Sequence, residues 1–338
     1  MNPNYRWLCL AIGLAAAGPV DGAPLFEEEA VLEIGLTGPL SELFSNRAER
    51  VEYPFTLETG GAGFELDVRV RGKSRIRVCD FPPLRLNFER GHTAGTAFAG
   101  QHRLKLVTHC INDDRGEIDL LEEYVAYRLF RVLSDFSYRV RLLRLRYADS
   151  TGKLDHGARE RFGFVIESTR ELAARTGTEP LDLAALRLSR VHSDQAARVF
   201  VFQYLIGNTD WSFVTSDGEQ HCCHNGKLLS GGDGIYYVPF DFDLAGLVNA
   251  PYAKPDPSLR LRNVRKRRYR GYCMDDAALQ SALRQVVAER ANLLGVAAST
   301  PGLDAADRTR ITEYLESFFE RAADEQKMLK SFARQCLD

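Results

Sequence analysis

Two aspartate-rich stretches decide how this chain is interpreted: Gly207-Asn208-Thr209-Asp210-Trp211 and Tyr237-Val238-Pro239-Phe240-Asp241-Phe242-Asp243, with His224-Asn225 between them. Transfer of a phosphoryl group needs a carboxylate near the nucleophile and oxygen ligands that hold Mg²⁺ against the phosphates. Asp210, Asn225 and Asp241 carry oxygens of this kind. Because Mg²⁺ keeps several of its waters, one or two carboxylates and an amide are a sufficient contribution from the protein. The stretches therefore indicate the two halves of a phosphotransfer site.

A second group of motifs lies upstream, in stretches with strand-like alternation: Val70-Arg71-Gly72-Lys73-Ser74, Pro83-Leu84-Arg85-Leu86-Asn87-Phe88 and Leu104-Lys105-Leu106. The two leucines beside Lys105 face the opposite side of a strand, so its amine can reach phosphates across a cleft. Arg85 and Arg71 compete with Lys105 for this role. A solvent-facing lysine is the alternative interpretation.

In these motifs the chain resembles the CotH-type kinases, atypical protein-kinase-like proteins named after a spore-coat member. Their pattern includes an R-G-N-S turn, here Arg71-Gly72-Lys73-Ser74, and then a K-P-Y-R-[IL]-K-F strand, here residues 83–88. The likeness continues through residues 121–130 and 162–167, which match the N-lobe helix and the hinge strand of that family. It covers about residues 65–245 and ends with the aspartate stretches.

The resemblance implies an α+β, bilobal, protein-kinase-like fold, with an antiparallel β-rich N-lobe and a mostly helical C-lobe. It also implies use of ATP with Mg²⁺ or Mn²⁺. Asp210 is then the catalytic base, Asp241 the principal metal ligand, and Asn225 and Asp243 auxiliary metal ligands. Lys105 is the phosphate clamp, paired with a glutamate of the following helix. The residues expected at the nucleotide are Arg71, Arg85, Lys105, Glu123 (with Glu122 as the other candidate for the pair) and Glu167.

Each aspartate also has a simpler interpretation. Asp210 could be an exposed turn residue after a helix. Asp241 and Asp243 alternate on a segment expected to be extended, so both point to one face and need a metal or a basic partner to offset their repulsion. A pair of aspartates that caps a loop is the alternative. The basic run at 260–272 either binds an acidic or phosphorylated partner or is a solvated loop.

Composition limits the class of protein. The chain has 338 residues, 45% of them hydrophobic and 27% charged, as expected for a globular protein long enough for two lobes. Its formal net charge of −2 argues against a general nucleic-acid binder. Residues 1–22 have the pattern of a secretory signal peptide, and no later stretch is apolar enough to span a membrane. The mature protein is therefore expected to be exported, to the periplasm or outside the cell.

Cysteine usage agrees with export. Removal of the signal peptide leaves an even number of cysteines, which favours disulfides in an exported protein. Many pairings are compatible with the sequence, but the adjacent Cys222 and Cys223 are expected to bond to different partners. The cysteines concerned are Cys79, Cys110, Cys222, Cys223, Cys273 and Cys336.

Periodicity along the chain divides it into two lobes. Alternation predicts strands at 30–36, 64–70, 74–88, 103–107, 138–147 and 161–167, and a helix at about 118–133. From residue 169 the pattern is mostly helical, with helices predicted at 170–175, 183–188, 193–206, 275–294 and 305–332 and an N-cap for the last at Asp304 or Thr300. The expected division is a signal peptide at 1–22, a β-rich lobe at 23–168 and a helical lobe at 169–338 with the aspartate site.

Two functions follow from these patterns. The first is an exported CotH-like kinase that transfers phosphate from a nucleotide to a protein or surface acceptor. The second is a kinase-fold binding or assembly module of the cell envelope without activity, which is favoured by the scarcity of ATP outside the cytoplasm. The two differ in whether Asp210, Asn225 and Asp241 converge on one ion position.

Overall fold

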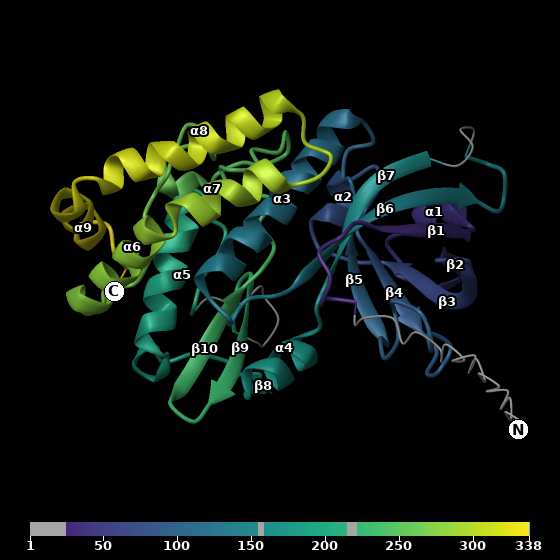
Figure 1. Ribbon diagram of the computed structural model, residues 1–338, viewed down its shortest axis with the longest axis horizontal. Coiled ribbons are helices and arrows are strands. Elements are labelled where there is room, and N and C mark those ends of the chain that lie inside the picture. Colours follow the sequence, from purple (N-terminus) through teal and green to yellow (C-terminus); the bar gives the residue numbers. More distant parts are fainter. Residues whose placement is uncertain (1–24, 155–158, 215–221, 338) are drawn as a thin grey trace, which may run out of the picture.

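The structure, a computed structural model, describes residues 25–154, 159–214 and 222–337. The predicted signal peptide lies outside the described residues. Figure 1 shows a β-rich part on one side and a helical part on the other. The chain is therefore a mixed α+β protein, as expected.

The β-rich part is a closed barrel of seven strands in the order β1-β2-β3-β4-β5-β7-β6. Neighbouring strands pair antiparallel except β1 and β6, which close the barrel in parallel. An antiparallel sheet was expected, so the parallel pairing of β1 with β6, which closes the barrel, corrects that prediction. The strands are β1 (Leu32–Gly38), β2 (Tyr53–Thr59), β3 (Ala62–Val70), β4 (Leu84–Phe88), β5 (Arg103–Val107), β6 (Val140–Asp149) and β7 (Arg159–Ile166).

Alternation along these strands separates an apolar interior from a polar exterior. In β3, Phe64, Leu66 and Val68 point into the barrel and are buried, while the residues between them are exposed or half-buried. One side of each strand therefore fills the barrel, which is the arrangement that a period of two residues predicts. The short helices α1 (Leu40–Ser45) and α2 (Arg75–Val78) lie against the barrel.

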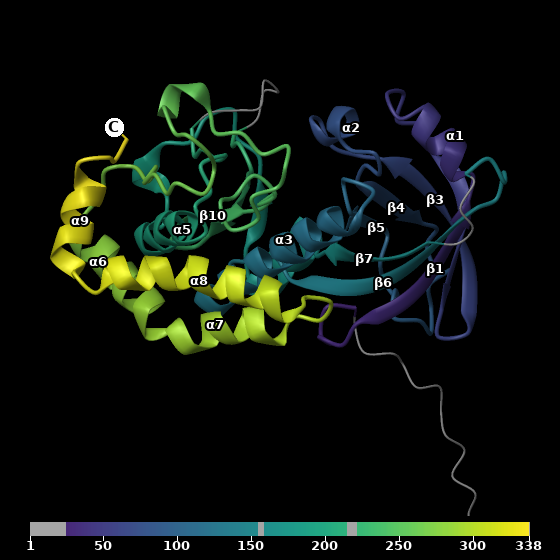
Figure 2. The ribbon, with the colours of Figure 1, turned by 90° about the horizontal axis from the view of Figure 1, so that it is seen from above.

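Helix α3 (Asp114–Leu133) connects the two parts. Its N-cap is Asp113, whose carboxylate accepts a hydrogen bond from the Gly116 amide at 2.7 Å. Figures 1 and 2 place α3 between the barrel and the helices of the other part, and it packs on both β7 and α7. Most of its length is buried, so it belongs to the core between the two parts.

The helical part contains a small antiparallel sheet in the order β10-β9-β8. Its strands are β8 (Glu179–Leu181), β9 (Gly226–Gly231) and β10 (Gly234–Pro239). Its helices are α4 (Thr169–Thr176), α5 (Ser193–Leu205), α6 (Asp276–Ala288), α7 (Arg290–Ser299), α8 (Ala305–Ala322) and α9 (Glu325–Ala333), with short 3-10 turns at Leu188–Arg190 and Pro257–Leu259. Among the described helices, none is long and apolar enough to cross a membrane.

Several predicted elements differ from the structure in detail. The single helices predicted at 275–294 and 305–332 are each two helices, α6 with α7 and α8 with α9. The helix predicted at 183–188 is not formed, and a 3-10 turn, Leu188–Arg190, begins at its last residue. The stretch predicted as one strand at 74–88 contains helix α2 before β4. Strands β2, β8, β9 and β10 were not predicted. Asp304 is the N-cap of α8, as one of the two alternatives had it.

Within the described part of the chain three disulfides are formed, Cys79–Cys110, Cys222–Cys223 and Cys273–Cys336. The expectation of disulfides is therefore met. The expectation that the two adjacent cysteines have different partners is wrong, because Cys222 and Cys223 pair with each other. The Cys79–Cys110 bond fixes the end of α2 to the loop before α3.

Candidate functional site

Asp210 lies in a tight turn directly after helix α5. Gly207 makes the turn with φ of +66°, and a side chain there would overlap the hydroxyl of Tyr314. The Asn208 side chain then accepts a hydrogen bond from the Asp210 amide at 2.9 Å, and its main-chain oxygen accepts one from the Trp211 indole at 3.2 Å. The turn therefore fixes the backbone of Asp210 and leaves its side chain 37% exposed.

Both carboxylate oxygens of Asp210 have partners from the segment before β9. His224 Nε2 lies 2.8 Å from Asp210 Oδ1. Asn225 Nδ2 donates to Asp210 Oδ2 at 2.8 Å and to its main-chain oxygen at 2.7 Å. The structure thus brings together two of the predicted site residues, Asp210 and Asn225, and adds His224.

Asn225 also links this turn to the second aspartate stretch. Gly226 pairs with Pro239 at the end of the β9–β10 hairpin, and the Phe240 amide donates to the Asn225 main-chain oxygen at 3.0 Å. Asp241 directly follows Phe240 in the chain. Both Asn225 and Asp241 have left-handed backbones, with φ of +50° and +65°. Such conformations gather at functional sites, although Asn and Asp adopt them more readily than most residues.

Asp241 and Asp243 share one cation, the guanidinium of Arg75 from helix α2. Arg75 Nη2 lies 2.6 Å from Asp241 Oδ1, and Arg75 Nε lies 2.9 Å from Asp243 Oδ2. Arg75 Nη2 also lies 3.0 Å from Glu123 Oε2 on α3. The basic partner that the two aspartates require is therefore an arginine, and Phe242 between them is buried against Tyr127 and Phe202.

The ionisation of this cluster reflects its burial. Burial alone would lower the pKa of Arg75, but Asp243, Glu123 and Asp241 more than offset it, so the pKa of Arg75 is raised well above its ordinary value. Burial raises the pKa of Glu123, and Arg75 opposes that change only in part. The pKa of Asp243 is raised by burial in the same way, against the field of Arg75. Arg75 is thus firmly a cation.

Arg75 was missed by sequence reasoning, and it takes the partner expected for Lys105. Glu123 pairs with Arg75, and Glu122 with Arg310 and Arg115. Among the residues that the structure describes, the predicted ion pair between Lys105 and this helix is therefore not formed. No local signal separates Arg75 from the neighbouring basic residues Lys73 and Arg77.

Lys105 lies instead in a cationic group on the outer face of the barrel. Arg85 on β4 pairs directly with Lys105 on β5, and the Lys105 amine lies 4.9 Å from the ring centre of Phe240. The pKa of Lys105 is lowered to about 7, first by burial and then by the repulsion of Arg71 and Lys227, while Asp241 opposes this change. Arg71, Arg85, Lys105 and Lys227 therefore form a cationic group beside Asp241, which we call the cationic cluster.

Glu167 directly follows β7 and has partners of its own. Its carboxylate accepts hydrogen bonds from the Arg139 amide at 3.0 Å and from the Arg175 guanidinium at 3.0 and 3.1 Å. Glu167 is buried. The structure therefore places this predicted nucleotide residue in an ion pair with Arg175 and not with the other predicted site residues.

The predicted metal ligands differ in how available their oxygens are to a metal ion. Within the described ranges, no group of three or more His, Cys, Asp or Glu side chains is arranged to hold a metal ion. Asp243 bonds to Arg75 and to the Tyr252 hydroxyl. Asp241 is 42% exposed and offers the oxygen that does not face Arg75, and Asn225 offers its amide oxygen because its Nδ2 binds Asp210. Asp241 and Asn225 fit a hard cation such as Mg²⁺ better than Asp243 does.

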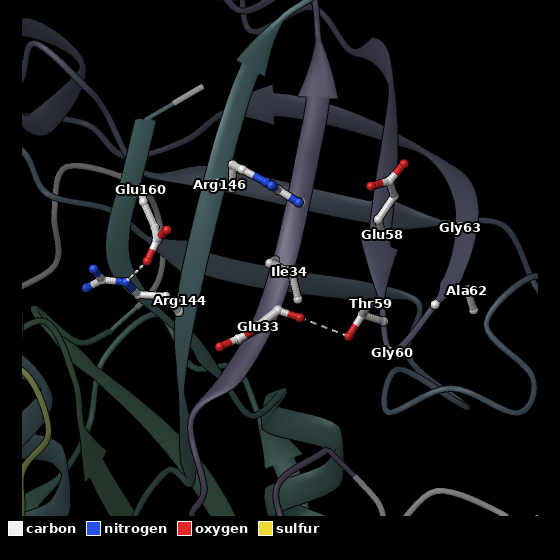
Figure 3. A pocket seen from close by; sticks show the side chains of 12 residues that line it. Glu33, Ile34, Glu58, Thr59, Gly60, Ala62, Gly63, Arg144, Arg146 and Glu160 are labelled. Atoms are coloured by element: carbon white, nitrogen blue, oxygen red, sulfur yellow. Dashed lines mark hydrogen bonds and ion pairs between the residues drawn. The ribbon is translucent and has the colours of Figure 1, made fainter. Parts of the chain in front are cut away.

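Two hollows bear on the site. One of about 220 Å³ is lined by Asp210 and His224 together with Lys254, Asp256 and Arg270. A larger one of about 580 Å³ lies on the outer face of β6, β1 and β2 (Figure 3) and contains none of the predicted site residues. In it, Arg144 pairs with Glu160, and Arg146 extends over β1 toward the strand of Glu58. Of the predicted site residues, Asp210 thus lies beside the smaller hollow.

Comparison with known proteins gives little. No family model and no curated protein matches the chain. Among solved structures, the chain is similar to the proinflammatory kinase CtkA of Helicobacter pylori, with a TM-score of 0.39 and 11% sequence identity, over 73% of this chain and 97% of that chain. A likeness this low carries no argument about the site.

Proposed function

We propose that this chain is an exported CotH-like kinase, which transfers phosphate from a nucleotide to a protein or surface acceptor. The proposal is carried by one continuous series of contacts. Asp210 is bonded to Asn225, the Asn225 main chain is bonded to Phe240, and Asp241 follows and is bonded to Arg75. The two aspartate stretches are thus joined at one place, where a base and a metal ligand of a phosphotransfer site need to be neighbours.

Asp210 is the proposed base for the acceptor hydroxyl. Its side chain is partly exposed and borders the smaller hollow, so an acceptor can reach it. His224 and Asn225 orient the carboxylate through one oxygen each. A positioned carboxylate of this kind contributes to the rate by orienting the hydroxyl and accepting its proton.

The cationic cluster is the proposed binding site for the nucleotide phosphates. Arg71, Arg85 and Lys105 come from one face of neighbouring strands or the turn beside them, and Asp241 is a nearby anion. Fixed cations of this kind stabilise charge that develops on transferred phosphoryl oxygens. Asp241 and Asn225 would hold Mg²⁺ or Mn²⁺, which would neutralise phosphate charge when bound.

A kinase-fold binding module without phosphotransfer is the second candidate. One observation favours it, because Arg75 already supplies Asp241 and Asp243 with a cation at 2.6 and 2.9 Å. Because the arginine offsets the repulsion between the two carboxylates, a metal is not required for that purpose. A module of this kind would keep the Arg75 cluster as a structural link between α2, α3 and the segment after β10.

Incorporation of labelled phosphate distinguishes the kinase from the binding module. The oxidised protein is incubated with ATP and Mg²⁺ or Mn²⁺, beside Asp210→Asn, Asp241→Asn and the matched control Asp276→Asn on the exposed start of α6. We expect transfer by the parent and the control, and a loss of about 10²- to 10⁴-fold in Asp210→Asn. Folded proteins that neither bind ATP nor transfer phosphate would establish the binding module instead.

A further inference from the structure

The hollow beside Asp210 is lined by two cations as well as by the proposed base. Lys254 and Arg270 line it together with Asp210 and His224. Arg270 Nη1 donates to the main-chain oxygen of Thr209 at 2.6 Å, so its guanidinium is fixed one residue away from Asp210. Lys254 is exposed. A molecule that brings a hydroxyl to Asp210 therefore meets both cations.

The anions of the hollow are largely committed to other groups. Both Asp210 oxygens accept hydrogen bonds, from His224 and Asn225. Asp256 accepts from the Ser258 amide at 2.8 Å and also lies in the field of Arg270. The cations are thus better placed than the carboxylates to bind an incoming molecule.

The surface next to the hollow is also cationic. Residues 257–270 contain seven arginines and lysines and no acidic residue. Arg267 is bonded internally to the Leu205 and Tyr314 main-chain oxygens, and Arg265 lies over the Tyr314 ring at 4.8 Å. The exposed members of the run are Arg260, Arg262 and Lys266. A chain that leaves the hollow along this segment would meet further positive charge.

We propose that the hollow is the acceptor site and that it takes a serine- or threonine-bearing peptide segment flanked by carboxylates. This inference rests on the proposed function for its reaction, in which the acceptor oxygen forms the new P–O bond, the bond from the γ-phosphorus to the ADP oxygen breaks, and Asp210 takes the hydroxyl proton. Lys254 and Arg270 bind the flanking carboxylates. Complementary charge of this kind selects partners and suppresses those of like charge.

A charge reversal tests the acceptor site. The probes are a short synthetic peptide with one serine among glutamates and the same peptide with lysines in place of the glutamates. The variant is Lys254→Glu, with Lys327→Glu on the exposed face of α9 as the matched control. We expect the parent and the control to prefer the acidic peptide, and Lys254→Glu to raise its KM about tenfold with a smaller change in kcat.

Direct binding separates this inference from the proposed function. Fluorescence anisotropy of the labelled peptides measures the acceptor site without any reaction, and release of phosphate from ATP without peptide measures the proposed function alone. Tighter binding of the acidic peptide, weakened in Lys254→Glu, supports the acceptor site even where no phosphate is transferred. Preference for the basic peptide, or equal binding by Lys254→Glu and Lys327→Glu, would overturn it.

Discussion

Arg75 Nη2 lies 2.6 Å from Asp241 Oδ1, although the two residues are 166 positions apart. The same guanidinium bonds to Glu123 and Asp243. Of these four residues, Arg75, Glu123 and Asp243 are buried, and Asp241 is partly exposed. Helix α2, helix α3 and the segment after β10 therefore meet at one side chain. An ion cluster of this kind is sensitive to the loss of one partner, because the remaining charges are left buried.

We therefore predict that Arg75→Met lowers the free energy of unfolding by about 3–5 kcal/mol. Glu123 and Asp243 would remain as buried carboxylates without their cation. Arg75→Lys keeps the charge but loses the planar fork, so its loss should be smaller. Equilibrium urea unfolding of the parent and both variants measures the difference. A cost for Arg75→Met within experimental error of zero would show that the cluster contributes nothing to stability.

The lowered pKa of Lys105 predicts proton uptake when an anion binds. Its pKa of about 7 leaves the amine mostly neutral at pH 8, because burial and then Arg71 and Lys227 disfavour the charge. A bound polyphosphate favours the charged form and raises this pKa, so the protein takes up about one proton per ligand at pH 8 and less at pH 6.

Calorimetric titration with a non-hydrolysable ATP analogue, in two buffers of different ionisation enthalpy, measures this uptake. Lys105→Met should abolish the buffer dependence, whereas Lys330→Met on α9, which is exposed, should keep it. Equal uptake in Lys105→Met and the parent would contradict the role of Lys105 as a phosphate ligand.

Local patterns predicted the parts of the fold that local sequence determines. The alternation in 64–70 and 103–107 became β3 and β5, and the helical period at 118–133 became most of α3. Closure of the barrel depends on the parallel pairing of β1 with β6, where Ile34 pairs with Leu145. A pairing between strands so far apart leaves no mark within either strand, so the sequence did not reveal it.

In the site, too, local motifs predicted some residues, and others depend on contacts between distant segments. Asp210 and Asn225 were predicted from their motifs, and the structure places them in contact. Arg75 was missed because its neighbours Lys73 and Arg77 are also basic, and nothing local indicates which of the three is buried. Its partners Glu123 and Asp241 lie 48 and 166 positions away. Only tertiary structure selects it.

The left-handed backbone of Asn225 predicts different results for two substitutions. Asn225→Gly removes both hydrogen bonds to Asp210 but adopts φ of +50° without strain. Asn225→Leu removes the same bonds and adds the cost of a left-handed conformation, about 1–2 kcal/mol. Both variants should lose phosphotransfer, and only the leucine variant should lose that additional stability. Urea unfolding beside the labelled-phosphate assay separates the two effects, and equal stability of the variants would contradict the argument.

The Cys79–Cys110 disulfide predicts a link between oxidation and the Arg75 cluster. Cys79 directly follows α2, and its amide donates to the Arg75 main-chain oxygen at 2.9 Å, so the disulfide restrains the segment that carries the guanidinium. The bond closes a loop of 31 residues, for which loop entropy gives about 3–4 kcal/mol of stability. The double variant Cys79→Ala/Cys110→Ala should lose this stability and also bind the ATP analogue more weakly, because Asp241 beside the cationic cluster loses its fixed partner.

The control is Cys273→Ala/Cys336→Ala, whose disulfide joins the loop before α6 to the C-terminal segment and should affect stability alone. Equal loss of nucleotide affinity in both double variants would mean that the first disulfide acts only through global stability.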